Sequence, residues 1–192
     1  PLDSAVPEPF EGTRRKSVSN IGRLEDQKNH RLLIEAFSIF HRKFPDYMLD
    51  IYGKGILEGE LKQLAREKGL EKQVTFHGFC SNAREEIRDS SMFVLSSDYE
   101  GISNSMLEAM AMGMPVISTD CPIGGSRMSI QDGVNGLLVP MKDAQALAAA
   151  MERVAGDPAL ARKLSQNARK IRQECTVEKI ADRFLEAARI GA

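Results

Sequence analysis

Apolar residues follow two spacings along the chain. Short apolar runs bounded by Gly, Ser or Asp are typical of buried strands, whereas repeats every three or four positions are typical of amphipathic helices. In residues 29–43, for example, Leu33, Phe37 and Phe40 recur at the helical spacing, and Pro45 ends the stretch. The pattern predicts strands at 18–22, 48–52, 74–77, 92–96, 115–118 and 137–139, and helices at 29–43, 57–68, 83–89, 144–155, 159–173 and 177–190.

The alternation of strands and helices predicts an α/β fold. We expect a doubly wound, mostly parallel, Rossmann-like sheet with helices on both faces. The 192 residues are enough for one domain. Residues 1–16 are rich in Pro, Glu and Ser and carry little apolar pattern, so we expect a linker there and the domain proper at 17–175. The last helix, in 176–192, has an apolar face that either packs on the sheet or stays partly uncovered.

Charge and composition argue against several classes of protein. The formal net charge is −1 and no basic block exceeds Arg14-Arg15-Lys16, so nucleic-acid binding is not indicated. No apolar run approaches the roughly 18 residues of a membrane-spanning helix, and the chain does not open like a signal peptide. We therefore expect a cytoplasmic protein, with a position at the inner face of the membrane left open. The three cysteines include no Cys-x-x-Cys pair, so neither a disulfide framework nor a zinc site is supported.

The stretch from Glu100 to Pro115 carries the most specific chemical signal. Glu100 and Glu108 lie on either side of the junction between a loop and a further helix, which we expect to begin near Asn104 or Ser105. Both of these are good N-cap residues, and the first-turn N–H groups of such a helix point, unsatisfied, toward whatever lies in front of the loop. A helix start after a parallel strand is a place where open α/β sheets bind anionic ligands.

This stretch resembles the Glu-x7-Glu motif of the retaining nucleotide-sugar glycosyltransferases of family four, which have the two-domain GT-B fold. The match runs through Glu100, Gly101, Asn104, Leu107, Glu108, Ala109, Met110, Ala111, Gly113, Pro115, Val116 and Ile117. Further matching pieces are Gly22-Arg23-Leu24, Lys28-Asn29, Ile51-Tyr52-Gly53-Lys54-Gly55, Val74-Thr75-Phe76-His77-Gly78-Phe79 and Asp132-Gly133-Val134-Asn135-Gly136-Leu137-Leu138-Val139-Pro140. They occur in the family's order and spacing, from about residue 17 to about residue 155.

The resemblance implies the C-terminal, donor-binding half of such an enzyme, at residues 17–175. The whole enzyme would transfer a hexosyl group from a nucleoside diphosphate sugar, expected to be a UDP-sugar, to a glycan or lipid-linked acceptor, with no metal ion or other cofactor. The acceptor would bind to an N-terminal half that precedes this one, and any peripheral contact with a membrane would go through that half. Because Pro1-Leu2-Asp3 looks like the tail of the family's crossover segment, we expect half an enzyme, inactive alone, with residues 176–192 crossing toward the other half.

The resemblance also implies roles for individual residues. Arg23 and Lys28 would hold the diphosphate, and together with Glu100, beside the donor sugar, they would form the catalytic group. Glu108 would hydrogen-bond the ribose hydroxyls, which suits a carboxylate because it offers two acceptor oxygens to a vicinal diol. The other expected donor-binding residues are Gly53, Cys80, Gly101, Ser103, Asn104, Ser105, Met106 and Leu107, the last three through their backbone amides.

Plainer interpretations stand beside these. Ser105-x-x-Glu108 fits a capping box, in which Glu108 only satisfies the N-terminus of its helix. Without the resemblance, Glu100, Arg23 and Lys28 would be solvated surface charges, with Lys28 at the unfavourable, positive end of a helix dipole. Two other functions also stay open: a non-catalytic nucleotide or glycan binding module, and a GT-B type sugar-nucleotide epimerase.

Three further features have weaker functional interpretations. The glycines at positions 53, 55 and 59 miss the dinucleotide-binding fingerprint by one residue, so we interpret them as a tight strand-to-helix turn. His30 and His77 have no acid or nucleophile beside them in sequence, which favours structural roles. Arg127 follows a pair of glycines where the family commonly has Pro-Glu, and it is a candidate contact for a charged group of the donor or acceptor.

Overall fold

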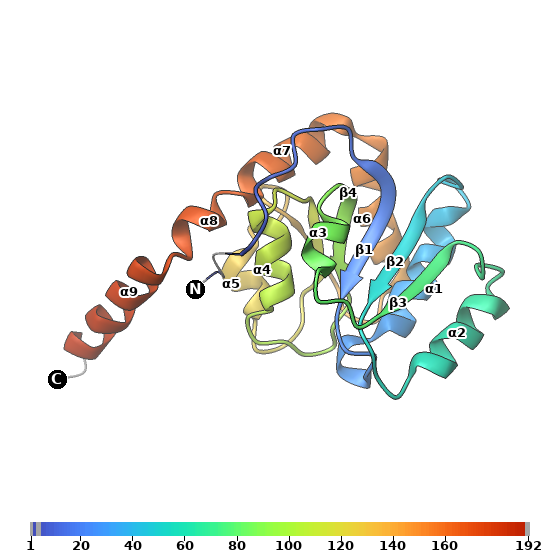
Figure 1. Cartoon of the computed structure of the whole chain (residues 1–192), viewed down its shortest axis with the longest axis horizontal. Helices are drawn as coiled ribbons and strands as arrows, with labels where there is room; N and C mark the ends of the chain where they lie inside the picture. Colours follow the sequence, from blue (N-terminus) through green and yellow to red (C-terminus); the bar gives the residue numbers. More distant parts are fainter. Residues whose placement is uncertain (1, 3–4, 191–192) are drawn as a thin grey trace.

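The strands form one parallel sheet, and the order of the strands fixes which loops meet (Figure 1). The computed structural model describes residue 2 and residues 5–190. The six strands are β1 (Arg15–Ile21), β2 (Met48–Tyr52), β3 (Val74–Gly78), β4 (Ser90–Leu95), β5 (Val116–Thr119) and β6 (Leu137–Val139). They pair in the order β3-β2-β1-β4-β5-β6, and every pair is parallel. This order confirms the predicted doubly wound α/β sheet.

Helices cover both faces of the sheet, as predicted. They are η1 (Asp26–Lys28), α1 (His30–His41), α2 (Glu58–Glu67), α3 (Ala83–Ile87), α4 (Asn104–Ala111), α5 (Gly125–Ser129), α6 (Ala144–Gly156), α7 (Pro158–Ala168), α8 (Ile171–Glu174) and α9 (Val177–Ile190). The core of one face includes α1, α2 and α6, where Phe37 and Phe40 are buried. The other core includes α3 and α4, where Met106 and Met110 are buried. Each face therefore buries an apolar stripe, the main favourable term in folding.

The structure differs from the predicted elements at several places, among them the unpredicted η1. β1 begins at Arg15, earlier than predicted, because the Arg15 guanidinium is held by Asp50 and Asp89 at 2.8 Å each. The stretch predicted as one helix is divided into α7 and α8, and the Lys170 and Arg172 amides donate to carbonyls three residues back, which tightens the turn between them. α5 was not predicted because its five residues show no helical repeat.

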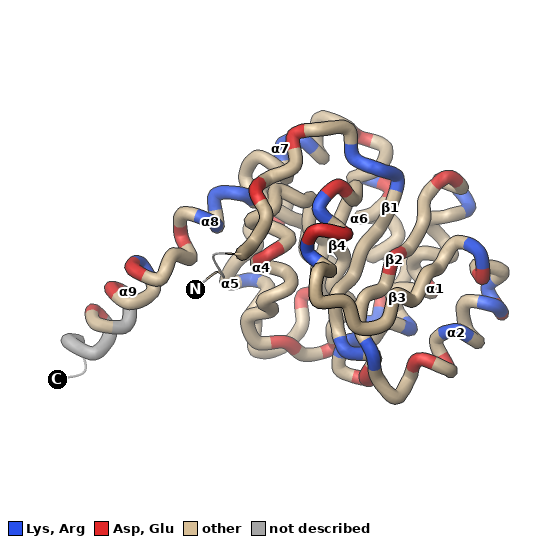
Figure 2. The backbone as a smooth tube through the Cα atoms, viewed as in Figure 1, with Lys and Arg blue, Asp and Glu red and all other residues tan. Residues whose placement is uncertain are grey.

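Residues 5–14, which we call the strap, lie along α7 and α8 (Figure 1). Val6 of the strap is 4% exposed, and Arg172 of α8 donates to its carbonyl at 3.0 Å. Acidic residues of the strap face basic residues of the helices (Figure 2): Arg172 pairs with Glu8 at 3.1 Å, and Arg169 with Glu11 at 2.6 Å. Much of the segment that we predicted as a linker thus packs on the domain.

The end of the strap is anchored by Arg14. Its guanidinium donates to the carbonyls of Gly113, Arg88 and Ser90, at 2.7, 2.9 and 3.0 Å. Burial lowers the pKa of Arg14 to about 10, an effect opposed by the nearby carboxylates. Three carbonyl acceptors compensate for the lost hydration of a buried cation, so this contact fixes the position where the chain enters β1.

Figure 1 shows α9 projecting from the rest of the domain beyond α8. The sequence predicts an apolar face for this helix made of Ile180, Ala181, Phe184, Leu185 and Ala188. Ala181 and Leu185 are exposed and Ile180 is half-buried, so this part of the face stays largely uncovered. The side chains of Phe184 and Ala188 lie outside the described part of the chain. No helix among the described residues is long and apolar enough to cross a membrane.

The loops that follow β1 and β2 touch through their backbones. Gly22 donates to the Tyr52 carbonyl at 2.9 Å, and Leu24 donates to the Lys54 carbonyl at 3.0 Å. At Gly53, φ is +148°, and a Cβ there would lie 1.9 Å from the Gly22 carbonyl oxygen. Only glycine allows this approach, which agrees with the interpretation of a tight strand-to-helix turn.

We expect Gly53→Ala to lower the free energy of unfolding by at least about 2 kcal/mol, because the methyl group meets backbone rather than a flexible side chain. Gly59→Ala is the matched control. A Cβ at Gly59 meets nothing within 4 Å, and in helix α2 the change should stabilise the fold by up to about 1 kcal/mol. Urea denaturation of both variants measures the difference. A wild-type midpoint for Gly53→Ala would contradict the described approach of the two loops.

Candidate functional site

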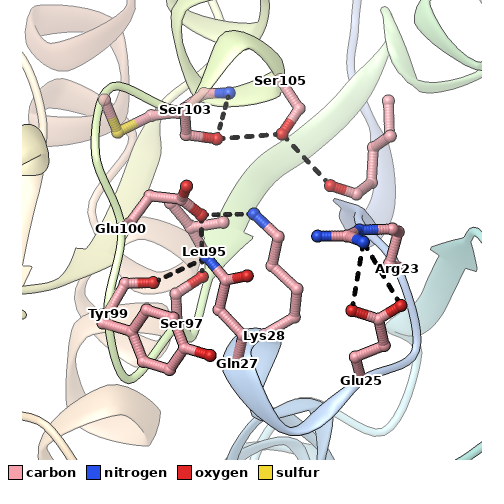
Figure 3. Close-up of polar contacts among 12 residues, drawn as sticks. Arg23, Glu25, Gln27, Lys28, Leu95, Ser97, Tyr99, Glu100, Ser103 and Ser105 are labelled. Carbon is pink, nitrogen blue, oxygen red and sulfur yellow. Dashed lines mark hydrogen bonds and ion pairs between the residues drawn. The ribbon is translucent and has the colours of Figure 1, made fainter.

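The candidate site lies at the carboxyl edge of the sheet, where η1 meets the loop between β4 and α4. Ser96 donates to the Lys28 carbonyl at 2.8 Å, and the Asp98 amide donates to the Gln27 carbonyl at 2.9 Å. The Gln27 side chain donates to the Tyr99 carbonyl at 3.0 Å (Figure 3). The chain runs from β1 to α1 on one face and from β4 to α4 on the other, and ligands of open α/β sheets bind at such a switch point.

Lys28 and Glu100 form an ion pair at the centre of this site (Figure 3). Their side chains are 15% and 12% exposed, so they are not the solvated surface charges of the plainer interpretation. Ser97 also donates to the same Glu100 oxygen, at 3.3 Å. Lys28 ends η1 and precedes the N-cap of α1, which is Asn29. Lys28 therefore belongs to the segment after β1, and its ammonium reaches across to the loop before α4.

The N-terminus of α4 is capped by Ser103, one or two residues earlier than predicted. The Ser103 hydroxyl accepts from the Met106 amide at 3.4 Å, and the Ser103 carbonyl accepts from the Leu107 amide at 3.0 Å. Both amides, expected to contact a diphosphate, are therefore engaged within the helix. Ser105 donates to the Ile21 carbonyl at 3.1 Å, which ties α4 to the end of β1. Asn104, an expected donor contact, is the first residue of the helix.

Glu108 does not belong to a capping box. With Ser103 as the N-cap, the capping-box position is Met106, and Glu108 lies two residues further along α4. Its carboxylate instead faces Arg84 of α3, with Nε and Oε2 3.7 Å apart. The capping-box interpretation is therefore wrong, because it placed the helix start too late.

The remaining predicted residues are spread along the same edge. Arg23 pairs with Glu25 at 3.3 Å and is 68% exposed, on the far side of Lys28 from Glu100 (Figure 3). Cys80 follows β3 and lines a surface cavity with Tyr52, His77, Phe79, Ser81 and Glu86. The Gly101 carbonyl lies against the first residue of α5, because a Cβ at Gly125 would lie 1.7 Å from its oxygen.

Sequence reasoning missed three residues of the site. Ser97 precedes the motif and carries no signal of its own, and Arg84 belongs to a short helix far from Glu108 in sequence. Cys121, from the loop after β5, is buried, and burial first and the Glu100 charge second raise the pKa of its thiol. Only a three-dimensional arrangement relates these residues to the Glu-x7-Glu motif.

Arg127, in α5, is paired with a residue of the loop that precedes this helix. Its guanidinium donates through two nitrogens to the carboxylate of Asp120, and this hydrogen bonding raises the Arg127 pKa. Its expected contact with a charged group of the donor or acceptor stays a prediction. Among the described residues, no three His, Cys, Asp or Glu side chains are grouped so that they could hold a metal ion.

His30 lies behind the site as a structural residue. Its Nε2 and the Asn20 Oδ1 are 2.9 Å apart, and Asn20 donates to the Val94 carbonyl at 2.7 Å, which joins β1 to β4. Burial first and the Lys28 charge second lower the His30 pKa to about 4. His77, which has no acid beside it in sequence, has one in space, because Asp50 lies 2.8 Å from its Nε2.

The chain matches the family described as Glycosyl transferases group 1 over residues 6–171, and it belongs to that family. The putative glycosyltransferase EpsD of Bacillus subtilis (strain 168) is 38% identical over 159 residues, which are 81% of this chain and 41% of EpsD. The chain thus spans less than half the length of this curated relative.

Solved structures agree with the family. The C-terminal domain of LpcC, a glycosyl transferase group 1 family protein from Francisella tularensis, has a TM-score of 0.81 at 27% identity, covering 91% of this chain and 98% of that one. A mutant of S. aureus TarM, solved with UDP among its ligands, has a TM-score of 0.87 at 27% identity and covers 94% of this chain and 37% of its own. The fold is that of the C-terminal domain of a GT-B glycosyltransferase.

The pKa of His30 makes a testable contribution to stability. The unfolded imidazole, with its ordinary pKa of 6.5, binds a proton more readily than the folded one, at about 4. Stability from this residue should therefore be present above about pH 6.5 and fall by up to about 3 kcal/mol as the pH drops toward 4. His30→Gln should lack this part of the pH dependence. Urea denaturation at several pH values measures it, and equal slopes for the two proteins would contradict the assignment.

Proposed function

We propose that this chain is the donor-nucleotide domain of a retaining glycosyltransferase that transfers a hexosyl group from a UDP-sugar to a glycan or lipid-linked acceptor. The observation that carries the proposal is the buried contact of Lys28 with Glu100 beside the N-terminus of α4. This contact places the Lys28 ammonium, which would bind a phosphate, next to the Glu100 carboxylate, which would accept hydrogen bonds from sugar hydroxyls. Similarity to TarM, whose structure contains UDP, supports the choice of nucleotide.

The proposed chemistry of this half is stabilisation of the leaving group. When the bond between the anomeric carbon and the diphosphate breaks, negative charge accumulates on the phosphate oxygens. Lys28, Arg23 and the N-terminal end of α4 supply positive charge that is already in place, so little reorganisation is needed as the charge develops. A guanidinium and an ammonium can meet this need without a metal ion.

The two glutamates have separate proposed roles. Glu100, on the loop before α4, would accept hydrogen bonds from hydroxyls of the donor sugar and so orient the anomeric carbon toward the acceptor. Glu108, further along α4, would accept from the two ribose hydroxyls. The ion pair between Glu108 and Arg84 supports this role, because it orients the carboxylate at the surface of α4.

The first test is nucleotide binding by the chain itself. UDP should bind in the presence of a chelator, and Glu108→Gln should weaken binding by roughly 1–3 kcal/mol, the range for a lost charged hydrogen bond. Glu60→Gln in α2 is the matched control. It removes the same charge from an exposed pair with Arg31 of α1 and should leave the affinity for UDP unchanged. Isothermal titration calorimetry measures both. Binding that vanishes in chelator, or equal affinities for Glu108→Gln and wild type, would contradict the proposal.

The second test is transfer. We expect residues 1–192 alone to transfer no sugar. In a GT-B enzyme the reaction takes place in a cleft between the donor-binding and acceptor-binding domains, from which water is excluded. Activity should appear in a longer polypeptide that also carries an acceptor-binding domain, and Lys28→Met should abolish it there. Product analysis with and without acceptor measures the outcome. Acceptor-dependent transfer by this chain alone would contradict the half-enzyme interpretation. Conversion of the donor sugar without acceptor would favour an epimerase.

A further inference from the structure

We propose that Glu100 makes the site discriminate against the sugar-free nucleotide, because it competes with the diphosphate for Lys28. The inference rests on the proposed function of the site and adds a second role for Glu100. One carboxylate would thus hold the sugar of the donor and, after transfer, favour release of the nucleoside diphosphate.

The competition follows from the geometry of the ion pair. The Lys28 ammonium contacts Glu100 Oε2, and both side chains are mostly buried. The stem of Lys28 passes near Gly22, where a Cβ would lie 3.5 Å from the Lys28 Cδ. A phosphate held by this ammonium brings a second anion next to the Glu100 carboxylate. Two anions on one partly buried cation repel each other, because the screening by water is weak there.

Relief of this repulsion depends on other donors for Glu100. A carboxylate that shares or loses its cation while it stays desolvated needs hydrogen bonds in compensation. The Ser97 hydroxyl already supplies one, at 3.3 Å. The hydroxyls of a donor sugar would supply more, whereas a sugar-free diphosphate brings none. The sugar-bearing donor therefore pays a smaller electrostatic cost than the product at the same phosphate position.

The surrounding structure makes the contact persistent. The backbone of η1 is joined to the loop before α4 by Ser96, Asp98 and Gln27, through the hydrogen bonds described above. Asn29 adds a side-chain hydrogen bond to Asp98, at 2.9 Å. Lys28 and Glu100 therefore stay facing each other, and an exchange of partners can occur by side-chain rotation without loop movement.

UDP titration by calorimetry in the presence of a chelator tests the proposal. Glu100→Gln removes the charge, and Glu100→Asp keeps the charge but withdraws the carboxylate from Lys28. Both should tighten UDP binding by about tenfold, because both release the ammonium. Glu60→Gln is the matched control: it removes a charge from the exposed pair with Arg31, which solvent screens, so UDP affinity should change less than about twofold.

The outcomes separate this inference from the proposed function. If wild-type protein binds no UDP, or if Lys28→Met leaves UDP affinity unchanged, the proposed function fails and the inference fails with it. If Lys28→Met weakens UDP but neither Glu100 variant tightens it, only the inference is overturned. Tightening in Glu100→Gln alone also overturns it, because repulsion between the Glu100 charge and the diphosphate, without competition for the Lys28 ammonium, then explains the result. Calorimetric stoichiometry reports the folded fraction separately from affinity, so misfolding of a variant cannot imitate tighter binding.

Discussion

The parallel pairing of β1 with β4 is the constraint on which the candidate site depends. These strands are separated in sequence by β2 and β3 but lie side by side in the sheet. After these strands the chain continues to α1 on one face of the sheet and to α4 on the other, so the two loops start side by side and then separate. Asn20 reinforces the pairing from inside by its hydrogen bond to the Val94 carbonyl. Every polar contact between η1 and the loop before α4 is built on this one adjacency.

Much of the fold could be predicted from apolar spacing, because α1 and α4 bury a stripe and the strands are short apolar runs. The failures have local physical causes. β1 starts at a charged residue, Arg15, whose place in the sheet depends on acids 35 and 74 residues away in sequence. The strap has almost no apolar pattern, because polar contacts hold it in place. Its Arg14 donates to backbone carbonyls of the domain, its Val6 carbonyl accepts from Arg172, and its Glu8 and Glu11 pair with Arg172 and Arg169.

Family resemblance nominated the charged groups of the candidate site, but not the partners that these groups contact. Lys28 and Glu100 are 72 positions apart, and nothing in local sequence indicates that they touch. The pair of Arg84 and Glu108 was equally invisible. The capping-box alternative failed because three serines or asparagines in succession offer several caps, and the choice of Ser103 depends on how the loop leaves β4. Sequence therefore identified the charged groups, and the fold identified their partners.

The strap has a mechanical consequence. The Leu2 amide donates to the Cys175 carbonyl at 2.8 Å, so the chain enters the domain beside the position where it leaves toward α9. The contacts of Arg172 with Val6 and Glu8 lie just before this point, so one arginine fixes two things at once: the path of the strap toward β1 and the position from which α9 leaves the rest of the domain.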